Sequence, residues 1–257
     1  MSALRFSITS VAVWAPGFAE VDALVRRTPD PSVSKPSALL LPARLRRRTS
    51  LLTRMIAEVC ERAMAAAELP RGAAGVVCAS AYGEIQTTGA LLTALTADAR
   101  EPLSPVRFHN SVHNTATGYL SIATENRGFN TALAAGRDSP AMAVLEGATA
   151  LRAGVCERVV VAIGEEPLPE PLAEVGGRYA PLAVGLALAP AGVGPDFVMS
   201  KETCSNNHVD TLPPLPAELS GNPCAAALRI VELWAGAAAS VPLGGGYALA
   251  RAEEGPR

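Results

Sequence analysis

The sequence predicts an α/β fold, in which short apolar strands alternate with amphipathic helices. Residues 111–166 show this alternation most clearly. Their periodicity predicts, in order, a helical segment at Ala116–Thr124, a strand at Asn130–Ala135, a helix at Pro140–Ala153 and a buried strand at Arg158–Ile163. A composition of 49% hydrophobic and 18% charged residues is typical of a globular protein. We therefore expect the 257 residues to form a single domain.

The same criteria predict elements in the rest of the chain. Further strands are expected at Phe6–Trp14, Ala74–Ser80 and Tyr179–Ala189, a long half-buried helix from Ser50 onward, and helices at Thr87–Ala97 and Asn222–Trp234. Thr28–Pro42 and Pro190–Pro216 are rich in loop-forming residues, and Pro190–Pro216 also contains His208. The last element is a glycine-rich turn followed by a final strand within residues 240–254.

Gly244-Gly245-Gly246 in this last element has two interpretations. Backbone N–H groups of consecutive glycines are able to cradle an anion. The segment lacks the Lys and Ser/Thr of a phosphate-binding P-loop, so a tight turn is the preferred interpretation.

A sharp strand-to-helix elbow is predicted at Gly136-Arg137-Asp138-Ser139. The strand before it leads directly into a helix, for which Ser139 is a suitable N-cap and Pro140 a suitable first residue. Enzymes of the α/β class often place a nucleophile at such an elbow, because the side chain projects into a cleft beside a helix N-terminus. The elbow is therefore the first place to look for a functional site.

The charge and hydropathy of the chain exclude several classes of partner. A net charge of −2 gives no general attraction to nucleic acid or to anionic membranes. No apolar run approaches the roughly 18 residues that a bilayer span requires. The N-terminal segment fits a first strand better than a signal peptide, so we expect a cytoplasmic protein.

Five cysteines are spread along the chain at Cys60, Cys78, Cys156, Cys204 and Cys224. None forms a CxxC pair, so the sequence predicts neither a metal site nor a redox site. We expect reduced thiols in the core and no cofactor.

The residues around the elbow also carry a family resemblance. The segment SVHNTATGYLSIATENRG, followed by a strand, the elbow, a helix and VVVAIGEE, resembles the N-terminal half of a β-ketoacyl synthase. The resemblance implies a thiolase-like layered fold, mostly one half of the duplicated ketosynthase fold. It is closest to short chain-length-factor-like proteins, including those of aryl-polyene pathways, and it extends from about Leu4 to Ala189.

In this resemblance, the acyl-accepting cysteine of the family falls on Arg137. Claisen condensation needs a thiolate, whereas arginine stays protonated and accepts no acyl group. The resemblance therefore implies a non-condensing subunit that pairs with an active ketosynthase in fatty-acid or polyketide-type biosynthesis. Arg137 itself is expected either to pair with Asp138 or Glu165 or to line the former acyl pocket.

Histidines near the elbow are weaker catalytic candidates. Histidine is a common acid–base residue, but His109 and His113 have no accompanying carboxylate or third ligand in the pattern. The resemblance places the catalytic basic side chains of the family in its other half. We expect His109, His113 and Asn114 to line a candidate pocket or an interface.

Two segments are candidate contact surfaces. Arg44, Arg46, Arg47 and Arg48 precede the long helix and form either a solvated loop with ion pairs or a docking patch for an acidic partner. The resemblance implies that this partner is an acyl carrier protein. It also implies dimerisation, with a ketosynthase or with a second copy, through the edge strand of Asn130, Thr131, Ala132, Leu133, Ala134 and Ala135.

Two hypotheses from other classes remain open. The first is an acyl-transfer or hydrolytic enzyme that uses Ser139 or one of the histidines, although no Ser-His-Asp spacing supports it. The second is a scaffold protein without an acyl ligand.

Overall fold

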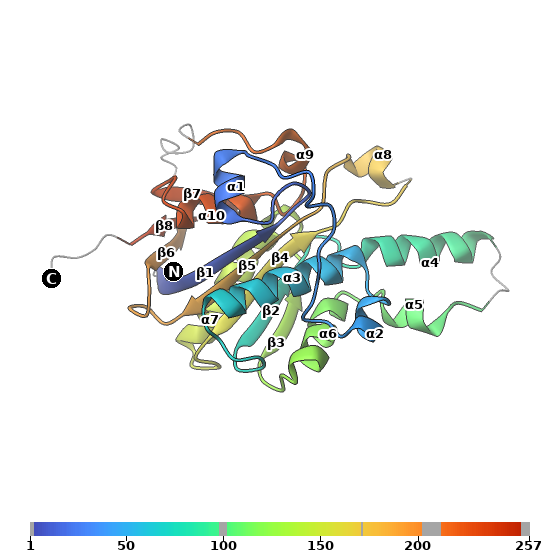
Figure 1. Cartoon of the computed structure of the whole chain (residues 1–257), viewed down its shortest axis with the longest axis horizontal. Coiled ribbons are helices and arrows are strands. Elements are labelled where there is room, and N and C mark those ends of the chain that lie inside the picture. The colour runs from blue at the N-terminus through green and yellow to red at the C-terminus, as the bar shows by residue number, and fades with distance from the viewer. Residues whose placement is uncertain (1–2, 98–101, 171, 202–211, 253–257) are drawn as a thin grey trace.

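An eight-stranded mixed β-sheet forms the centre of the molecule (Figure 1). The computed structural model describes residues 3–97, 102–170, 172–201 and 212–252. The strand order is β3-β2-β4-β5-β1-β6-β8-β7. The strands are β1 Leu4–Trp14, β2 Gly75–Ala79, β3 Asn130–Leu133, β4 Val159–Glu165, β5 Leu182–Ala189, β6 Asp196–Lys201, β7 Ser240–Gly244 and β8 Tyr247–Arg251.

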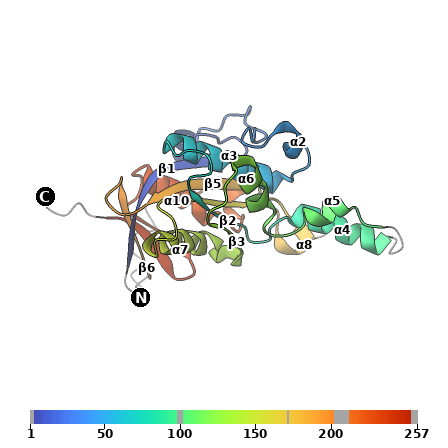
Figure 2. The ribbon, with the colours of Figure 1, turned by 90° about the horizontal axis from the view of Figure 1, so that it is seen from below.

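Helices cover both faces of the sheet, which gives three layers (Figure 2). The helices α3 and α6 pack on one face, and α7 and α10 pack on the other. The helix bounds are α1 Val21–Arg26, α2 Ala43–Arg46, α3 Leu51–Ala66, α4 Ile85–Ala97, α5 Pro105–His109, α6 Thr115–Thr124, α7 Ser139–Arg152, α8 Leu172–Gly176, α9 Ala217–Ser220 and α10 Ala226–Trp234. Helices α4 and α5 project beyond one end of the sheet in both views.

The central strands are buried on both faces, which is why they are continuously apolar in sequence. Along β4, Val161 and Ile163 join the core on the α7 side, whereas Val160 and Ala162 join the core on the α3 side. The α3 side of β5 includes Gly185, at which an added Cβ would lie 2.4 Å from the Val59 carbonyl oxygen. Small residues on this side therefore let α3 approach the sheet closely.

A β-bulge in β1 explains an apparent break in the strand pattern. The register between β1 and β5 shifts between Ile8 and Ser10. Because of this extra residue, Ile8 and Val11 both join the α7-side core in spite of their odd separation. Ser10 faces the other side, where its hydroxyl donates to the Ala63 carbonyl oxygen of α3 at 2.7 Å.

The predicted helix from Ser50 is confirmed in its start and its burial. Ser50 is the N-cap of α3, and its hydroxyl accepts a hydrogen bond from the Thr53 N–H at 2.9 Å. The predicted elements around the elbow are also confirmed, with ends that differ by one or two residues. Strand β3 ends at Leu133, so Ala134 and Ala135, which were expected in the edge strand, lie outside it.

The C-terminal third departs most from the sequence prediction. The predicted loop Pro190–Pro216 contains strand β6, which pairs with β1 and β8; His208 lies outside the described residues. The predicted single final strand is a hairpin, β7 with β8, and α10 begins at Ala226 instead of Asn222. Strand β6 was missed because it is held by long-range pairing with β1. A six-residue strand that pairs only with distant segments carries little local signal in the sequence.

Candidate functional site

The strand-to-helix elbow lies at the carboxyl ends of the parallel strands. Strands β2, β3 and β4 are mutually parallel, so Ser80, the elbow after Leu133 and Glu165 all lie at the same edge of the sheet. In open α/β sheets, this edge is where ligands bind. The elbow is therefore located where a functional site is expected.

The backbone of the elbow is held by the side chain of Ser139. Gly136 has a φ of 58° and begins a turn of 3₁₀ helix that ends at Asp138. The Ser139 hydroxyl accepts from the Ala135 N–H at 3.0 Å and donates to the Gly136 carbonyl oxygen at 2.8 Å. Ser139 is fully buried and is the first residue of α7, not its N-cap as predicted. Its hydroxyl closes the turn and is not exposed as a nucleophile.

Arg137 is exposed at the tip of the elbow. The prediction that it pairs with Asp138 or Glu165 is wrong. Among the residues that the structure describes, the Arg137 guanidinium forms no ion pair and no side-chain hydrogen bond. Asp138 instead accepts a hydrogen bond from the Gly245 N–H at 2.7 Å, and Glu165 is buried below the surface. The guanidinium is therefore available to an external group.

The glycine-rich turn between β7 and β8 packs against the elbow. Gly244, Gly245 and Gly246 all have positive φ, at 91°, 62° and 71°. A Cβ at Gly244 would lie 2.9 Å from Asp138 Oδ1 and 3.3 Å from the Arg137 carbonyl oxygen. The predicted tight turn is confirmed, and one of its N–H groups also binds an anion, the carboxylate of Asp138. Sequence analysis missed this contact, because the two segments are 107 residues apart.

Several buried carboxyl groups lie at the same ends of the parallel strands as the elbow. Glu165 accepts hydrogen bonds from the Ser80 hydroxyl at 2.7 Å and from the Tyr82 N–H at 3.0 Å. Glu166 accepts from the N–H groups of Leu52 and Gln86, at 3.2 Å each. One oxygen of Glu165 has no partner within the described part of the chain.

Burial raises the pKa of each carboxyl in this group. Burial raises the pKa of Glu165 to about 7, against the opposing effect of its hydrogen bond from Ser80. Burial and then the nearby Glu84 charge raise the pKa of Glu166 to about 8. The pKa of Glu84 is raised by burial as well. The signal for this group in the sequence was the pair Glu165-Glu166 directly after a buried strand, where polar residues reach the edge of the sheet.

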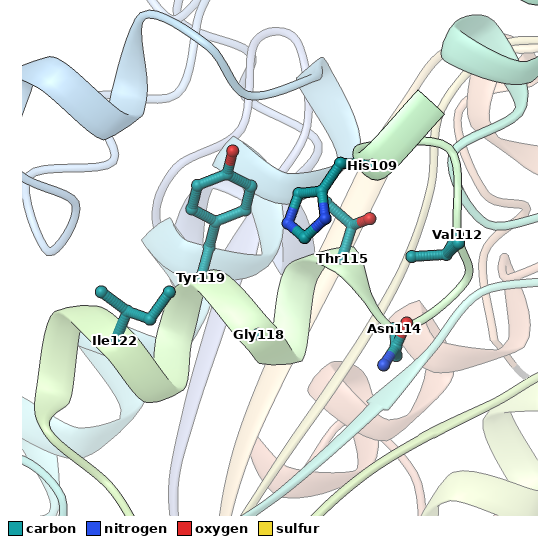
Figure 3. A pocket seen from close by; sticks show the side chains of 7 residues that line it. All are labelled: His109, Val112, Asn114, Thr115, Gly118, Tyr119 and Ile122. Carbon is teal, nitrogen blue, oxygen red and sulfur yellow. The ribbon is translucent and has the colours of Figure 1, made fainter. Parts of the chain in front are cut away.

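The two histidines near the elbow have different surroundings. His109 and Asn114 line a surface cavity of about 380 Å³ together with Val112, Thr115, Gly118, Tyr119 and Ile122 (Figure 3). His113, which was expected in the same pocket, does not line it. Its Nε2 lies 2.8 Å from the Leu133 carbonyl oxygen at the end of β3, so it connects the segment before α6 to the edge strand.

The predicted arginine cluster spans α2 and the loop before α3. Arg44, Arg47 and Arg48 are exposed. Arg46 is half-buried and donates to the Ser37 carbonyl oxygen at 3.0 Å, so it contributes to the loop structure. Arg47 and Arg48 line a second cavity, to which α5 contributes Arg107, a residue that sequence analysis did not single out.

Edge strand β3 and the projecting helices expose apolar surface on one side of the molecule. All four residues of β3 are half-buried. Exposed apolar side chains are present on α4, α5 and α6 and between them; they include Leu92, Phe108, Val112 and Ile122, of which Phe108 is 63% and Ile122 is 65% exposed. At the other edge of the sheet, β7 contains Pro242, which lacks a backbone donor.

The thiols within the described ranges are all free. Cys60, Cys78 and Cys224 are buried, and Cys156 is half-buried. Burial raises the pKa of the Cys60 thiol to about 12 and raises those of the other three as well. Cys204 lies outside the described residues. Thiolates are therefore disfavoured at all four described positions.

The described part of the chain contains neither a cluster of metal-ligating side chains nor a membrane-spanning helix. Residues 3–97, 102–170, 172–201 and 212–252 contain no group of three or more His, Cys, Asp or Glu side chains arranged to hold a metal ion. Across the same ranges, no helix has the length and apolar character needed to cross a bilayer.

Comparison with known proteins extends the resemblance noted above. The family described as "Beta-ketoacyl synthase, N-terminal domain" matches residues 23–240, well beyond the predicted limit at Ala189. No curated protein matches the chain significantly.

Several solved structures share the fold. One is a chain of the complex between the ketosynthase ApeO and its chain length factor ApeC from Xenorhabdus doucetiae, with a TM-score of 0.72 and 21% identity. The match covers 96% of this chain and 100% of that one. Another is the ishigamide ketosynthase/chain length factor, with a TM-score of 0.63, 17% identity, and coverage of 80% and 69%. A third is the complex AntDE:AntF, a type II polyketide synthase acyl carrier protein with its ketosynthase bound to the hexaketide, with a TM-score of 0.61, 17% identity, and coverage of 78% and 70%.

The layered mixed sheet with an elbow at its carboxyl edge therefore defines a thiolase-like α/β protein of the ketosynthase type. More specifically, the family match covers most of the chain, and the chain belongs to the family of β-ketoacyl synthase N-terminal domains.

Proposed function

We propose that this chain is a non-condensing, chain-length-factor-like subunit that pairs with an active ketosynthase in fatty-acid or polyketide-type biosynthesis, such as an aryl-polyene pathway. The observation that carries the proposal is the elbow. Arg137 is exposed at its tip, and the hydroxyl of the neighbouring Ser139 is buried and hydrogen-bonded within the turn. A guanidinium neither attacks nor holds an acyl group.

No described thiol compensates for the missing nucleophile. Cys78 lies in β2 and Cys224 near the start of α10, and burial raises the pKa of both well above that of a free thiol. A thiolate is the reactive form in acyl transfer, so neither position favours acylation. The acyl-transfer and hydrolase hypotheses lose their serine candidate, because the Ser139 hydroxyl is buried and hydrogen-bonded within the turn.

Arg137 is also unfavourable for the stability of the helix that follows it, because α7 begins two residues later at Ser139. A cation at the N-terminal end of a 14-residue helix opposes the helix dipole. An exposed cation in such a position is better explained by a contact outside the chain. A carboxylate of the pairing subunit, or a ligand in a shared tunnel, would provide this contact.

Strand β3 is the proposed pairing edge. The Ser80 N–H donates to the Leu133 carbonyl oxygen at 3.3 Å, and the Val76 N–H donates to that of Phe129 at 2.9 Å. Odd-numbered residues of this segment therefore bond to β2, and the backbone groups of Asn130 and Ala132 face outward. This open edge, unlike the proline-containing edge of β7, is suited to continuing a sheet across a dimer.

The exposed arginines are the proposed docking patch for an acidic acyl carrier protein. Arg44 and Arg47 are exposed without an ion pair among the described residues, so charge reversal at both should reduce the association rate with carrier protein without unfolding the chain. Arg46 is unsuitable for this test because its side chain supports the loop. Association should also weaken steadily with added salt, and salt-independent binding would contradict the docking patch.

Intact-mass spectrometry tests the central claim. The purified chain, alone and in complex with a ketosynthase of the same pathway, is incubated with acyl-carrier protein or an acyl thioester. We expect an acyl adduct on the ketosynthase and none on this chain. A stable adduct on Cys78, Cys224 or Ser139 would refute the non-condensing assignment.

Co-expression followed by analytical ultracentrifugation tests the pairing. An obligate interface of this kind should bury more than about 2,000 Å² in total, so the heteromer should remain intact at low concentration. The substitution Ala132→Pro removes an outward-facing donor without breaking the pairing with β2, and it should abolish association while circular dichroism stays unchanged. A stable monomer that ignores every ketosynthase of the pathway would favour the scaffold hypothesis.

A further inference from the structure

A cavity of about 610 Å³ lies between the loop before α3, the start of α4 and helix α5. Three arginines from two separate segments line it: Arg47 and Arg48 from the loop, and Arg107 from α5. The proposed function uses Arg47 as part of the docking patch but assigns no role to Arg48, to Arg107 or to the cavity itself. The grouping is a product of the fold, because Arg107 is about 60 residues from the other two in sequence.

The loop that carries Arg47 and Arg48 is held rigidly by side chains that bind its carbonyl groups. The Asn110 amide, at the end of α5, donates to the Arg48 carbonyl oxygen at 2.9 Å. The Arg54 guanidinium donates to the Thr49 carbonyl oxygen at 3.0 Å. Asn110 thus ties the loop directly to the helix that provides Arg107. The arginine side chains therefore start from positions that are already brought together, which lowers the ordering cost of binding a ligand.

These guanidinium groups have no anionic partner within the described residues. Arg47 makes one hydrogen bond, to the Ala43 carbonyl oxygen at 3.3 Å, and the side chains of Arg48 and Arg107 make none. Some other arginines are neutralised: Arg5 pairs with Asp196 at 2.9 Å, and Arg229 pairs with Glu232 at 2.6 Å. Three arginines without an anionic partner in the described part of the chain therefore converge on this cavity.

Among the described residues that line the cavity, Glu166 is the one with a carboxyl group, and both of its oxygens already accept hydrogen bonds. They accept from the N–H groups of Leu52 and Gln86 at the starts of α3 and α4. Burial and the nearby Glu84 charge raise the pKa of Glu166, so its negative charge is reduced near neutral pH. The cavity as a whole is positively charged, with apolar wall contributed by Leu51, Ala90 and Val106.

We propose that this cavity binds a phosphate ester that is attached to a narrow organic chain, with the phosphate held by Arg48 and Arg107. Guanidinium groups form bidentate hydrogen bonds with phosphate oxygens. Two or three positive charges suit a dianionic phosphate better than they suit a carboxylate, which carries one negative charge. The apolar wall accommodates the organic chain beside the phosphate. If the proposed function holds, this phosphate ester is the phosphopantetheine arm of a carrier protein. The alternative is a free phosphate ester.

Isothermal titration of the full chain with 4′-phosphopantetheine and with pantetheine tests the cavity itself. The two probes differ only in the phosphate. We expect 4′-phosphopantetheine to bind at least tenfold more tightly, and the double variant R48Q/R107Q to bind both probes equally. The variant R152Q, which neutralises an exposed arginine on α7, should keep the difference. Equal binding of the two probes by the unmodified chain, or a preference that survives in R48Q/R107Q, would overturn the proposal.

Titration with apo and holo carrier protein distinguishes the source of the phosphate. Tighter binding of the holo form, with the difference lost in R48Q/R107Q, supports a carrier-borne ligand. Equal binding of the two forms refutes the carrier arm as the ligand. If carrier protein fails to bind in either form while 4′-phosphopantetheine binds, the docking part of the proposed function fails and the cavity assignment stands.

Discussion

Replacing Glu165 by glutamine should make the protein more stable at alkaline pH. Glu165 is fully buried at the end of β4, where Ser80 and Tyr82 donate hydrogen bonds to one of its oxygens. A glutamine has the same shape, and its carbonyl oxygen accepts the same two hydrogen bonds. The substitution therefore removes an ionisable proton with little change in packing.

The sign of the effect follows from the raised pKa. Burial raises the pKa of Glu165 from the ordinary value of 4.5 to about 7. Below pH 4.5 the carboxyl is protonated in both the folded and the unfolded chain and has no effect on pH dependence. As the pH rises from 4.5 to 7, the unfolded chain loses this proton first, so the free energy of unfolding falls. Above pH 7 the free energy of unfolding falls no further on account of Glu165.

The magnitude is set by the width of this window. At about 1.4 kcal/mol per pH unit, the loss attributable to Glu165 has a ceiling of about 3 kcal/mol. Glu84 and Glu166 are carboxyl groups in the same buried region, and the charge of Glu165 raises the pKa of Glu166. Removal of the Glu165 charge therefore also relieves part of the cost of ionising Glu166. Relative to the unmodified chain, E165Q should gain about 1–3 kcal/mol between pH 5 and pH 8.

Urea unfolding at pH 5, 6, 7 and 8, at one fixed protein concentration, measures this difference. Glu157 is exposed, so E157Q is the matched control, and its curve should run parallel to that of the unmodified chain. Parallel curves for E165Q as well would show that Glu165 ionises normally in the folded state. A larger loss of stability in E165Q at pH 8 would show that its charge is stabilising, which contradicts the reasoning from burial.

Two further predictions concern packing and the elbow. In urea unfolding, G185A should lower the free energy of unfolding by about 2–4 kcal/mol, because the added methyl group would meet the Val59 backbone of α3. The control G118A changes an exposed helical position with open space around it, and it should raise the free energy of unfolding by about 0.5–1 kcal/mol. Similar effects of the two substitutions would contradict the close approach of α3 to β5. D138A should lower the thermal unfolding midpoint and increase amide hydrogen exchange at Gly245, because Asp138 holds the N–H of that residue; unchanged exchange would show that the turn is held without this contact.

Local pattern determined most of the fold. The continuous apolar run of β4 predicted a strand that is buried on both faces, and both faces of that strand are covered by helices. The apolar spacing after Ser50 predicted the long helix, and a turn between two periodic segments predicted the elbow. These features depend on neighbours within one or two turns of helix or one strand, so their physical causes are all present in short stretches of sequence.

The surroundings of the site depended on tertiary structure. Glu165-Glu166 was visible as a pair of carboxylates, but their burial beside Glu84 depends on how β2, β4 and α3 pack. Similarly, Arg137 stood next to Asp138 in sequence, and yet the carboxylate binds a glycine turn instead of the guanidinium. Hydrogen-bond partners that are far apart in the chain leave no periodic signal, because their spacing is decided by the whole path of the backbone.

The sequence by itself thus determined the class of fold, the position of the elbow and the residue at its tip, because each of these follows from short-range periodicity, turn chemistry and residue identity. Only the tertiary structure decided that strand β6 and the β7–β8 hairpin extend the same sheet, that the hairpin turn clamps Asp138, and that Arg107 joins Arg47 and Arg48 around one cavity. The physical reason is that these contacts join segments separated by tens to hundreds of residues. Their free energy is gained only when the complete core has formed around them.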